Sequence, residues 1–125
     1  MNVLLDTSVI IDWLRQKDSR DTWLFQLLKA DCRLFVPVVV VAELYSGSSV
    51  WQVENARLRL EGFLRECQII SLEPNSAVLA GRIKDKYKIN LIDALVAAEA
   101  MERSLKLATL NTRDFAKIEG LELVK

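Results

Sequence analysis

The sequence contains no histidine among its 125 residues, and this absence excludes several kinds of active site. Without histidine the chain cannot build a Ser-His-Asp or Cys-His nucleophile, a histidine general base or a histidine-based zinc site. The two cysteines, Cys32 and Cys67, stand apart without neighbouring metal ligands, so we interpret both as free thiols. If the protein is an enzyme, carboxylates are expected to carry its chemistry.

Neither sign of charge dominates, and no apolar run is long enough to span a bilayer. Lysine plus arginine number 17 and aspartate plus glutamate number 17, so the chain has no general basic field and any polyanion must be held locally. The longest apolar run, residues 35–42, is far shorter than the roughly 20 residues of a membrane helix. No basic region precedes the first apolar stretch. The sequence therefore predicts a cytoplasmic protein without a membrane span.

Strand and helix patterns alternate along the whole chain. With 51% apolar residues, the chain is long enough for a single domain over residues 1–125 and too short for two. Short apolar runs predict strands at residues 3–5, 33–36, 68–72, 106–109 and 121–124. Helical spacing and caps predict helices at 8–15, from 19, at 37–45, at 49–67, from 74 and from 91. This alternation predicts an α/β fold with a mainly parallel sheet of about five strands.

Asp6 stands where the first predicted strand gives way to a helix. In open α/β sheets the carboxyl ends of the strands are where ligands bind, so an acid at this junction is expected to face a crevice. The alternative is structural, because an aspartate before Thr7 and Ser8 can simply cap the following helix. Asp6 alone does not decide between these two interpretations.

Residues 37–45 carry conflicting signals for a strand and for a helix. The β-branched residues favour a strand, whereas a proline in the first turn favours a helix. A strand would bury the charge of Glu43 inside a sheet, so we predict a helix that turns Glu43 away from the core. Ser46 and Gly47 continue its face with small side chains and leave room for a ligand. The residues expected on the core side of this helix are Val38, Val41, Ala42 and Tyr45.

Two further acids follow predicted strands in the same way. Asn90 is expected to cap a helix, with Asp93 at its third position, where acids are also favoured by the helix dipole alone. Ala97 and Ala100 extend the face of Asp93 and allow close approach of another element, so we expect Asp93 to point into a crevice. Asp114 lies in a polar loop after a short strand, where it is either a site residue or an ordinary turn acid.

Asp6, Glu43, Asp93 and Asp114 are thus expected on one rim of a parallel sheet. Carboxylates gathered in this way raise one another's pKa unless cations neutralise them. With no histidine and no paired cysteine, the cations that fit are Mg²⁺ or Mn²⁺, which prefer oxygen ligands. Such ions, completed by a substrate phosphate, can support hydrolysis of a phosphodiester.

Four motifs in this order resemble those of PIN-domain ribonucleases, and specifically of VapC toxins from toxin-antitoxin pairs. They are LLDTS at 4–8, AEL at 42–44, DALVAA at 93–98 and TLNTRDF at 109–115, and the resemblance covers essentially the whole chain. Matched residue by residue, the metal-binding acids of that family fall on Asp6, Glu43, Asp93 and Asp114. Its supporting polar positions fall on Thr7, Ser8, Thr109 and Asn111.

The resemblance implies a PIN-like three-layer α/β/α fold and an endoribonuclease that depends on Mg²⁺, with Mn²⁺ able to substitute. It also implies the toxin of a type II pair, which inhibits translation, forms a homodimer and is held inactive by a small VapB-like antitoxin. Tyr45, Trp51 and Val53 surround the break at residues 46–49, where they form either ordinary core or a partly exposed groove for that partner.

Two other functions remain open from the sequence. A haloacid-dehalogenase-like phosphatase also begins with an aspartate after its first strand, but it needs a second aspartate two residues later, where Ser8 stands. A catalytically inert PIN domain that only binds proteins would keep the same acids without using them. Metal-dependent cleavage of RNA separates all three functions.

Overall fold

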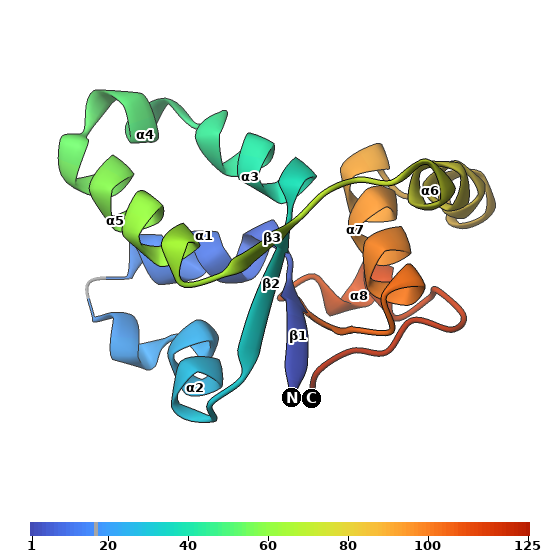
Figure 1. The fold of residues 1–125 in the computed structure, drawn as a ribbon, viewed down its shortest axis with the longest axis horizontal. Coiled ribbons are helices and arrows are strands. Elements are labelled where there is room, and N and C mark those ends of the chain that lie inside the picture. Colours follow the sequence, from blue (N-terminus) through green and yellow to red (C-terminus); the bar gives the residue numbers. More distant parts are fainter. Residues whose placement is uncertain (17) are drawn as a thin grey trace.

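The computed structural model describes residues 1–16 and 18–125, and it shows a three-layer α/β/α arrangement (Figure 1). Within the described residues the central sheet has four parallel strands in the order β3-β2-β1-β4. The strands are β1 (Asn2–Leu5), β2 (Arg33–Pro37), β3 (Gln68–Ile70) and β4 (Lys106–Ala108). The mainly parallel α/β fold expected from the sequence is therefore confirmed.

Helices cover both faces of this sheet (Figure 1). One face carries α1 (Thr7–Arg15), the 3-10 turn η1 (Ser19–Asp21), α2 (Trp23–Lys29), α3 (Val38–Tyr45), α4 (Ser48–Gln52) and α5 (Glu54–Arg65). The other face carries α6 (Pro74–Tyr87), α7 (Leu91–Glu102) and α8 (Thr112–Phe115). None of the helices in the described part of the chain combines the length and apolar character needed to cross a membrane.

The central strand β1 is buried on both sides, as expected for a parallel sheet covered by helices. Val3, Leu4 and Leu5 have no exposed surface. Leu4 lies opposite Phe35 of β2 and Leu107 of β4, so β1 is paired along both edges. Because these strands are parallel, their carboxyl ends meet at one edge of the sheet, and the residues that follow them are brought together there.

The fifth strand expected at residues 121–124 is replaced by a single bridge. Leu123 pairs with Leu107 in parallel, and the amide of Val124 donates to the carbonyl of Leu107 at 2.9 Å. Gly120 precedes this segment with a φ of 90°, a left-handed conformation that glycine adopts without strain. The segment therefore extends the sheet by one bridged residue without forming a strand.

Two helix predictions need correction. The helix expected over 49–67 is divided into α4 and α5, because Val53 between them is extended, with φ −117° and ψ 108°. The helix expected from Ser19 begins only at Trp23, after the short turn η1. Its cap is Thr22, whose side chain accepts a hydrogen bond from the amide of Phe25. A hydroxyl residue three positions later thus does what Ser19 was expected to do.

The two cysteines are free thiols, as the sequence predicts. The Cys67 thiol donates to the carbonyl oxygen of Phe63 at 3.5 Å. Burial raises the pKa of this thiol to about 12, and the charge of Glu66 adds to the effect. A thiol that stays protonated at neutral pH is a poor nucleophile, so Cys67 is not a candidate for catalysis.

Candidate functional site

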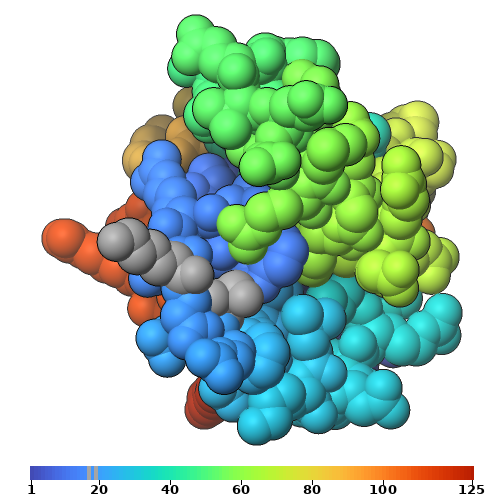
Figure 2. Space-filling view, turned by 90° about the vertical axis from the view of Figure 1, so that its left-hand side faces the viewer, coloured from blue at the N-terminus to red at the C-terminus, as the bar shows by residue number. Residues whose placement is uncertain are grey.

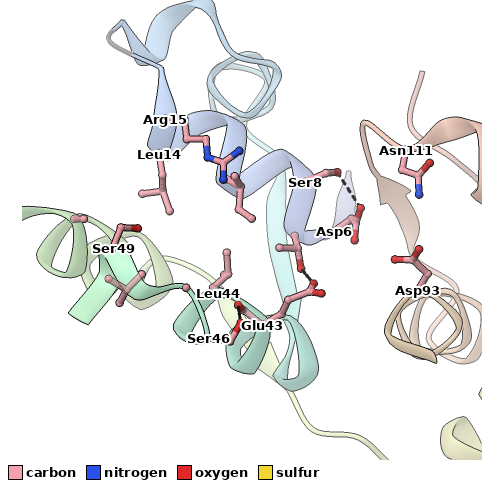
Figure 3. A pocket seen from close by; sticks show the side chains of 15 residues that line it. Asp6, Ser8, Leu14, Arg15, Glu43, Leu44, Ser46, Ser49, Asp93 and Asn111 are labelled. Carbon is pink, nitrogen blue, oxygen red and sulfur yellow. Dashed lines mark hydrogen bonds between the residues drawn. The ribbon is translucent and has the colours of Figure 1, made fainter. Parts of the chain in front are cut away.

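A cavity of about 540 Å³ opens at the edge of the sheet where β1, β2 and β4 end. Figure 3 shows its walls, which come from the whole length of α1, from α3 to α5, from the N-terminal end of α7 and from the loop after β4. Its volume lies within the roughly 300–1,000 Å³ typical of small-ligand sites. The residues that line it are Asp6, Thr7, Ser8, Ile11, Leu14, Arg15, Glu43, Leu44, Ser46, Gly47, Ser49, Val50, Ala56, Asp93 and Asn111.

Asp6 is held rigidly at the closed end of this cavity. It is 5% exposed, and its amide continues the sheet by donating to the carbonyl of Ala108 at 3.0 Å. Its Oδ2 accepts hydrogen bonds from Ser8 Oγ at 2.9 Å and Thr109 Oγ1 at 2.7 Å. Although Asp6 occupies the N-cap position of α1, its side chain makes no capping hydrogen bond. Capping therefore does not account for this carboxylate.

The hydroxyls that hold Asp6 also fix the loop after β4. Ser8 Oγ accepts from the amide of Leu110 at 3.0 Å, and Thr109 Oγ1 accepts from the amide of Asn111 at 3.0 Å. Thr109 is 1% exposed and lies behind the cavity wall, whereas Ser8 and Asn111 line the cavity. Ser8 and Thr109 are thus structural supports that set the direction of the Asp6 carboxylate.

Glu43 reaches the cavity from α3, where its Oε1 accepts a hydrogen bond from Thr7 Oγ1. The helix predicted over 37–45 is confirmed, as is the small-residue wall at Ser46 and Gly47. Glu43 is exposed, as predicted for a residue turned away from the core.

The predicted core face of α3 is half right: Val41 and Tyr45 are partly buried against the core, but Val38 and Ala42 are not. The buried residues are Val40 and Leu44, whereas Val38 is 42% exposed and Ala42 is also exposed. Residues 38–42 are all apolar, so their pattern carries no information about which of them faces inward.

Asp93 lies in the first turn of α7, half-buried and facing the cavity. Asn90 caps this helix as predicted: its Oδ1 accepts from the Asp93 amide and its Nδ2 donates to Asp93 Oδ2, both at 2.8 Å. The pKa of Asp93 is raised from 3.8 to about 6 by several causes together, of which burial is the largest. The charge of Asp6, and less strongly those of Glu43 and Asp114, raise it further, while the Asn90 hydrogen bond opposes them.

Asp114 is placed at the margin of this group. It lies in α8 and does not line the cavity, although its charge contributes to the raised pKa of Asp93. Its Oδ2 accepts from Asn111 Nδ2 at 3.3 Å, and its Oδ1 pairs with Lys117 Nζ at 3.4 Å. The structure therefore brings Asp6, Glu43 and Asp93 into one cavity (Figure 3) and holds Asp114 behind Asn111.

The donor atoms of the cavity suit a hard divalent cation. They are carboxylate, hydroxyl and carboxamide oxygens, with neither thiol nor imidazole among the lining residues. In the described part of the chain, no three acidic or cysteine side chains stand close enough to chelate one ion together. Mg²⁺ does not need such a cage, since proteins usually hold it through one or two carboxylates, with water and substrate phosphate as further ligands. Asp6 and Asp93, with Glu43 beside them, fit that description.

The sequence did not reveal the second half of the cavity, which runs away from the acids along α1. Its walls are mostly apolar, and Arg15 and Ser49 stand at its far end (Figure 3). Ser8, Ile11 and Arg15 are spaced i, i+3 and i+7, so they share one face of a helix. This spacing was the one feature of the sequence that could have indicated the second half of the cavity. It identifies a cavity wall only once α5 is known to pack opposite α1.

Comparisons with known proteins agree with this geometry. A model of the PIN domain matches residues 3–121. Ribonuclease VapC1 of Rickettsia felis is 30% identical over 133 aligned positions, which cover 99% of this chain and 96% of that protein. The chain belongs to the PIN-domain family, as a VapC-type member.

Solved structures of toxin-antitoxin complexes share this fold. A toxin-antitoxin complex from Klebsiella pneumoniae superposes with a TM-score of 0.75 at 26% identity, covering 95% of this chain and 94% of that one. A DNA-bound VapBC from Salmonella typhimurium gives a TM-score of 0.81 at 22% identity, covering 99% and 97%. The family match excludes the phosphatase alternative.

The raised pKa of Asp93 predicts how stability depends on pH. Between pH 3.8 and about 6 the folded protein holds a proton on Asp93 that the unfolded chain has released, so this group's contribution to stability falls as the pH rises through that window. We expect Asp93→Asn to melt about 2–5 °C above the wild type at pH 7 without metal, and this difference to shrink towards pH 4.

Thermal melts of both proteins in EDTA across this pH range test the prediction. Asp85→Asn is the matched control, because Asp85 is an exposed acid on α6 with 88% of its side chain accessible. If the difference in melting temperature between Asp93→Asn and the wild type stayed constant with pH, the raised pKa of Asp93 would not be its cause.

Proposed function

We propose that this protein is a metal-dependent endoribonuclease and the toxin of a VapBC-like pair, and that it inhibits translation by cutting RNA in the cytoplasm. The observation that carries the proposal is the convergence of Asp6, Glu43 and Asp93 in one cavity at the carboxyl edge of the sheet. Burial, together with the charges of the neighbouring acids, raises the pKa of Asp93, and a bound cation would offset the cost of keeping this carboxylate ionised. The VapC relative and the toxin-antitoxin complex agree with this function.

We assign the binding of Mg²⁺ or Mn²⁺ to Asp6 and Asp93, with Glu43 assisting. When bound, such a cation offsets the charge of the RNA phosphate and lowers the pKa of a nucleophilic water. Ser8 and Thr109 donate to Oδ2 of Asp6 and leave its other oxygen free to bind the cation. Asn90 likewise donates to Oδ2 of Asp93 and leaves Oδ1 without a hydrogen bond from the described residues. Asp114 acts through Asn111, which it holds at the cavity wall.

The antitoxin is proposed to bind beside the cavity, on the apolar surface formed by Tyr45, Trp51 and Val53. Trp51 is 62% exposed and Val53 is 50% exposed, so neither is ordinary core. The indole of Trp51 donates to the carbonyl of Tyr45 at 2.7 Å, and the two rings lie 5.8 Å apart, which fixes this surface in place. The proposed homodimer follows from the VapC resemblance.

The ends of the RNA products test the proposed chemistry. Attack of water on phosphorus is expected to leave a 5′-phosphate and a 3′-hydroxyl, and ligation-based sequencing detects both. A substrate with a single 2′-deoxy nucleotide at the cut should still be cleaved, because the ribose hydroxyl takes no part. A 2′,3′-cyclic phosphate, or resistance of the 2′-deoxy substrate, would show that the 2′-hydroxyl is the nucleophile and that the mechanism is wrong.

A further inference from the structure

The cavity has two chemically different ends. Asp6, Glu43 and Asp93 converge at one end, whereas Arg15 and Ser49 stand at the other, across from each other on α1 and α4 (Figure 3). Between the two ends the walls are apolar and come from Ile11, Leu14, Leu44, Val50 and Ala56. The acids account for cutting a phosphodiester, but they do not account for this second half of the cavity.

Arg15 is the one basic side chain among the described residues that line the cavity. It is exposed, and it makes no hydrogen bond or ion pair with any residue that the structure describes. Other arginines of the same face have structural partners: Arg59 donates to the carbonyl of Leu14 at 3.2 Å and lies 4.8 Å from the Trp13 ring, and Arg57 pairs with Glu61. Arg15 is therefore available to a ligand.

Helix α1 fixes the distance between the two ends. Asp6 directly precedes the helix and Arg15 is its last residue, so about 13 Å separates their backbones at a rise of 1.5 Å per residue. Figure 2 shows the face on which α1 lies beside α4 and α5, which form the opposite wall. A strand of RNA with one phosphate at the acids would bring a phosphate roughly one or two nucleotides away to Arg15.

Electrostatics favour RNA as the occupant of this end. The chain has a net charge of zero and three carboxylates face the cutting end, so the phosphates of RNA meet repulsion there unless a local cation holds the strand. A guanidinium binds phosphate through two parallel hydrogen bonds and fixes its direction.

We propose that Arg15 binds an RNA phosphate one or two nucleotides from the one that is cut, and so positions single-stranded RNA along the whole cavity. This inference rests on the ribonuclease function proposed above. The apolar walls between the acids and Arg15 then lie against the sugar and base of the intervening nucleotide. Arg15 contributes to binding the substrate and takes no part in the chemical step.

The test measures binding separately from cleavage. Fluorescence anisotropy of a single-stranded RNA of about 12 nucleotides is recorded in EDTA over a range of salt concentrations for wild type, Arg15→Gln and Arg15→Lys. The matched control is Arg65→Gln, because Arg65 is also an exposed arginine in the last turn of its helix but does not line the cavity. Thermal melts establish that each variant is folded.

We expect Arg15→Gln to weaken RNA binding about fivefold to tenfold and to reduce the slope of log affinity against log salt by about 0.7, the value for one lost phosphate contact on a single strand. Arg15→Lys should recover part of the loss, and Arg65→Gln should match wild type. In Mg²⁺, Arg15→Gln should raise KM and leave kcat unchanged.

The role of Arg15 would be overturned if Arg15→Gln bound RNA as tightly as the wild type. It would also be overturned if Arg65→Gln lost as much RNA affinity as Arg15→Gln. A loss of kcat without a change in RNA binding would also overturn it. These results are distinct from failure of the ribonuclease function itself, which would appear as no cleavage by the wild-type protein in Mg²⁺.

Discussion

Asp6→Asn is expected to reduce RNA cleavage at least about a hundredfold while leaving the metal-free fold as stable as the wild type or more so. Asparagine keeps an oxygen that can accept from Ser8 and Thr109, so the hydrogen bonds at this buried position survive. It removes the negative charge that a hard cation needs and that acts on Asp93. Asp6→Asn should therefore lose cleavage activity without losing stability.

Steady-state cleavage and thermal melts in EDTA measure the two effects. Asp12→Asn is the control on the same helix, because the Asp12 carboxylate accepts from Gln16 at 3.1 Å and does not line the cavity. In the Asp6 variant an NMR titration should also show the pKa of Asp93 moving down from about 6, since one of the charges that raise it is gone. A large drop in Tm would instead identify Asp6 as a structural residue.

The sequence predicted the acid end of the cavity because each acid there follows a signal that local rules can read. Asp6 ends a buried apolar run, and Asp93 follows the cap Asn90 by three residues. In a parallel sheet the ends of such strands must share one edge, so proximity follows from topology alone. No long-range contact had to be guessed for these two residues.

The errors arose where the sequence pattern does not determine the structure. The run at residues 38–42 is uniformly apolar, so its helical phase was set by packing against the sheet and not by spacing. Val53 fits an amphipathic stripe, yet it adopts an extended conformation that breaks the helix, and half of its surface is exposed. Its role depends on how α4 folds back, which local propensity does not encode.

The position of Asp114 shows a third kind of limit. Its motif matches the family and its loop follows β4 as expected, while its carboxylate contacts Asn111 and Lys117 and does not line the cavity, so its metal-binding role stays a prediction. Spacing along the chain places a residue near a site, whereas side-chain hydrogen bonds decide whether it faces the ligand. The half of the cavity around Arg15 was not predicted because it is formed by the packing of α1 against α5, which spacing along the chain does not determine.

Removal of divalent metal is expected to abolish cleavage completely, because three carboxylates without a cation would repel the RNA phosphate. Addition of Mg²⁺ or Mn²⁺ to the EDTA-treated protein should restore activity. EDTA saturated beforehand with Mg²⁺ is the control and should have no effect. Full activity of the wild type in EDTA would exclude a metal-dependent mechanism.

The location of the ion tests the central claim most directly. Crystals of the protein soaked in Mn²⁺ and measured at a wavelength where manganese scatters anomalously would show where the cation binds. The account predicts an anomalous peak within the cavity, in contact with Asp6 and Asp93, that disappears in Asp6→Asn. A map with no peak there, or a peak that persists in Asp6→Asn, would contradict it.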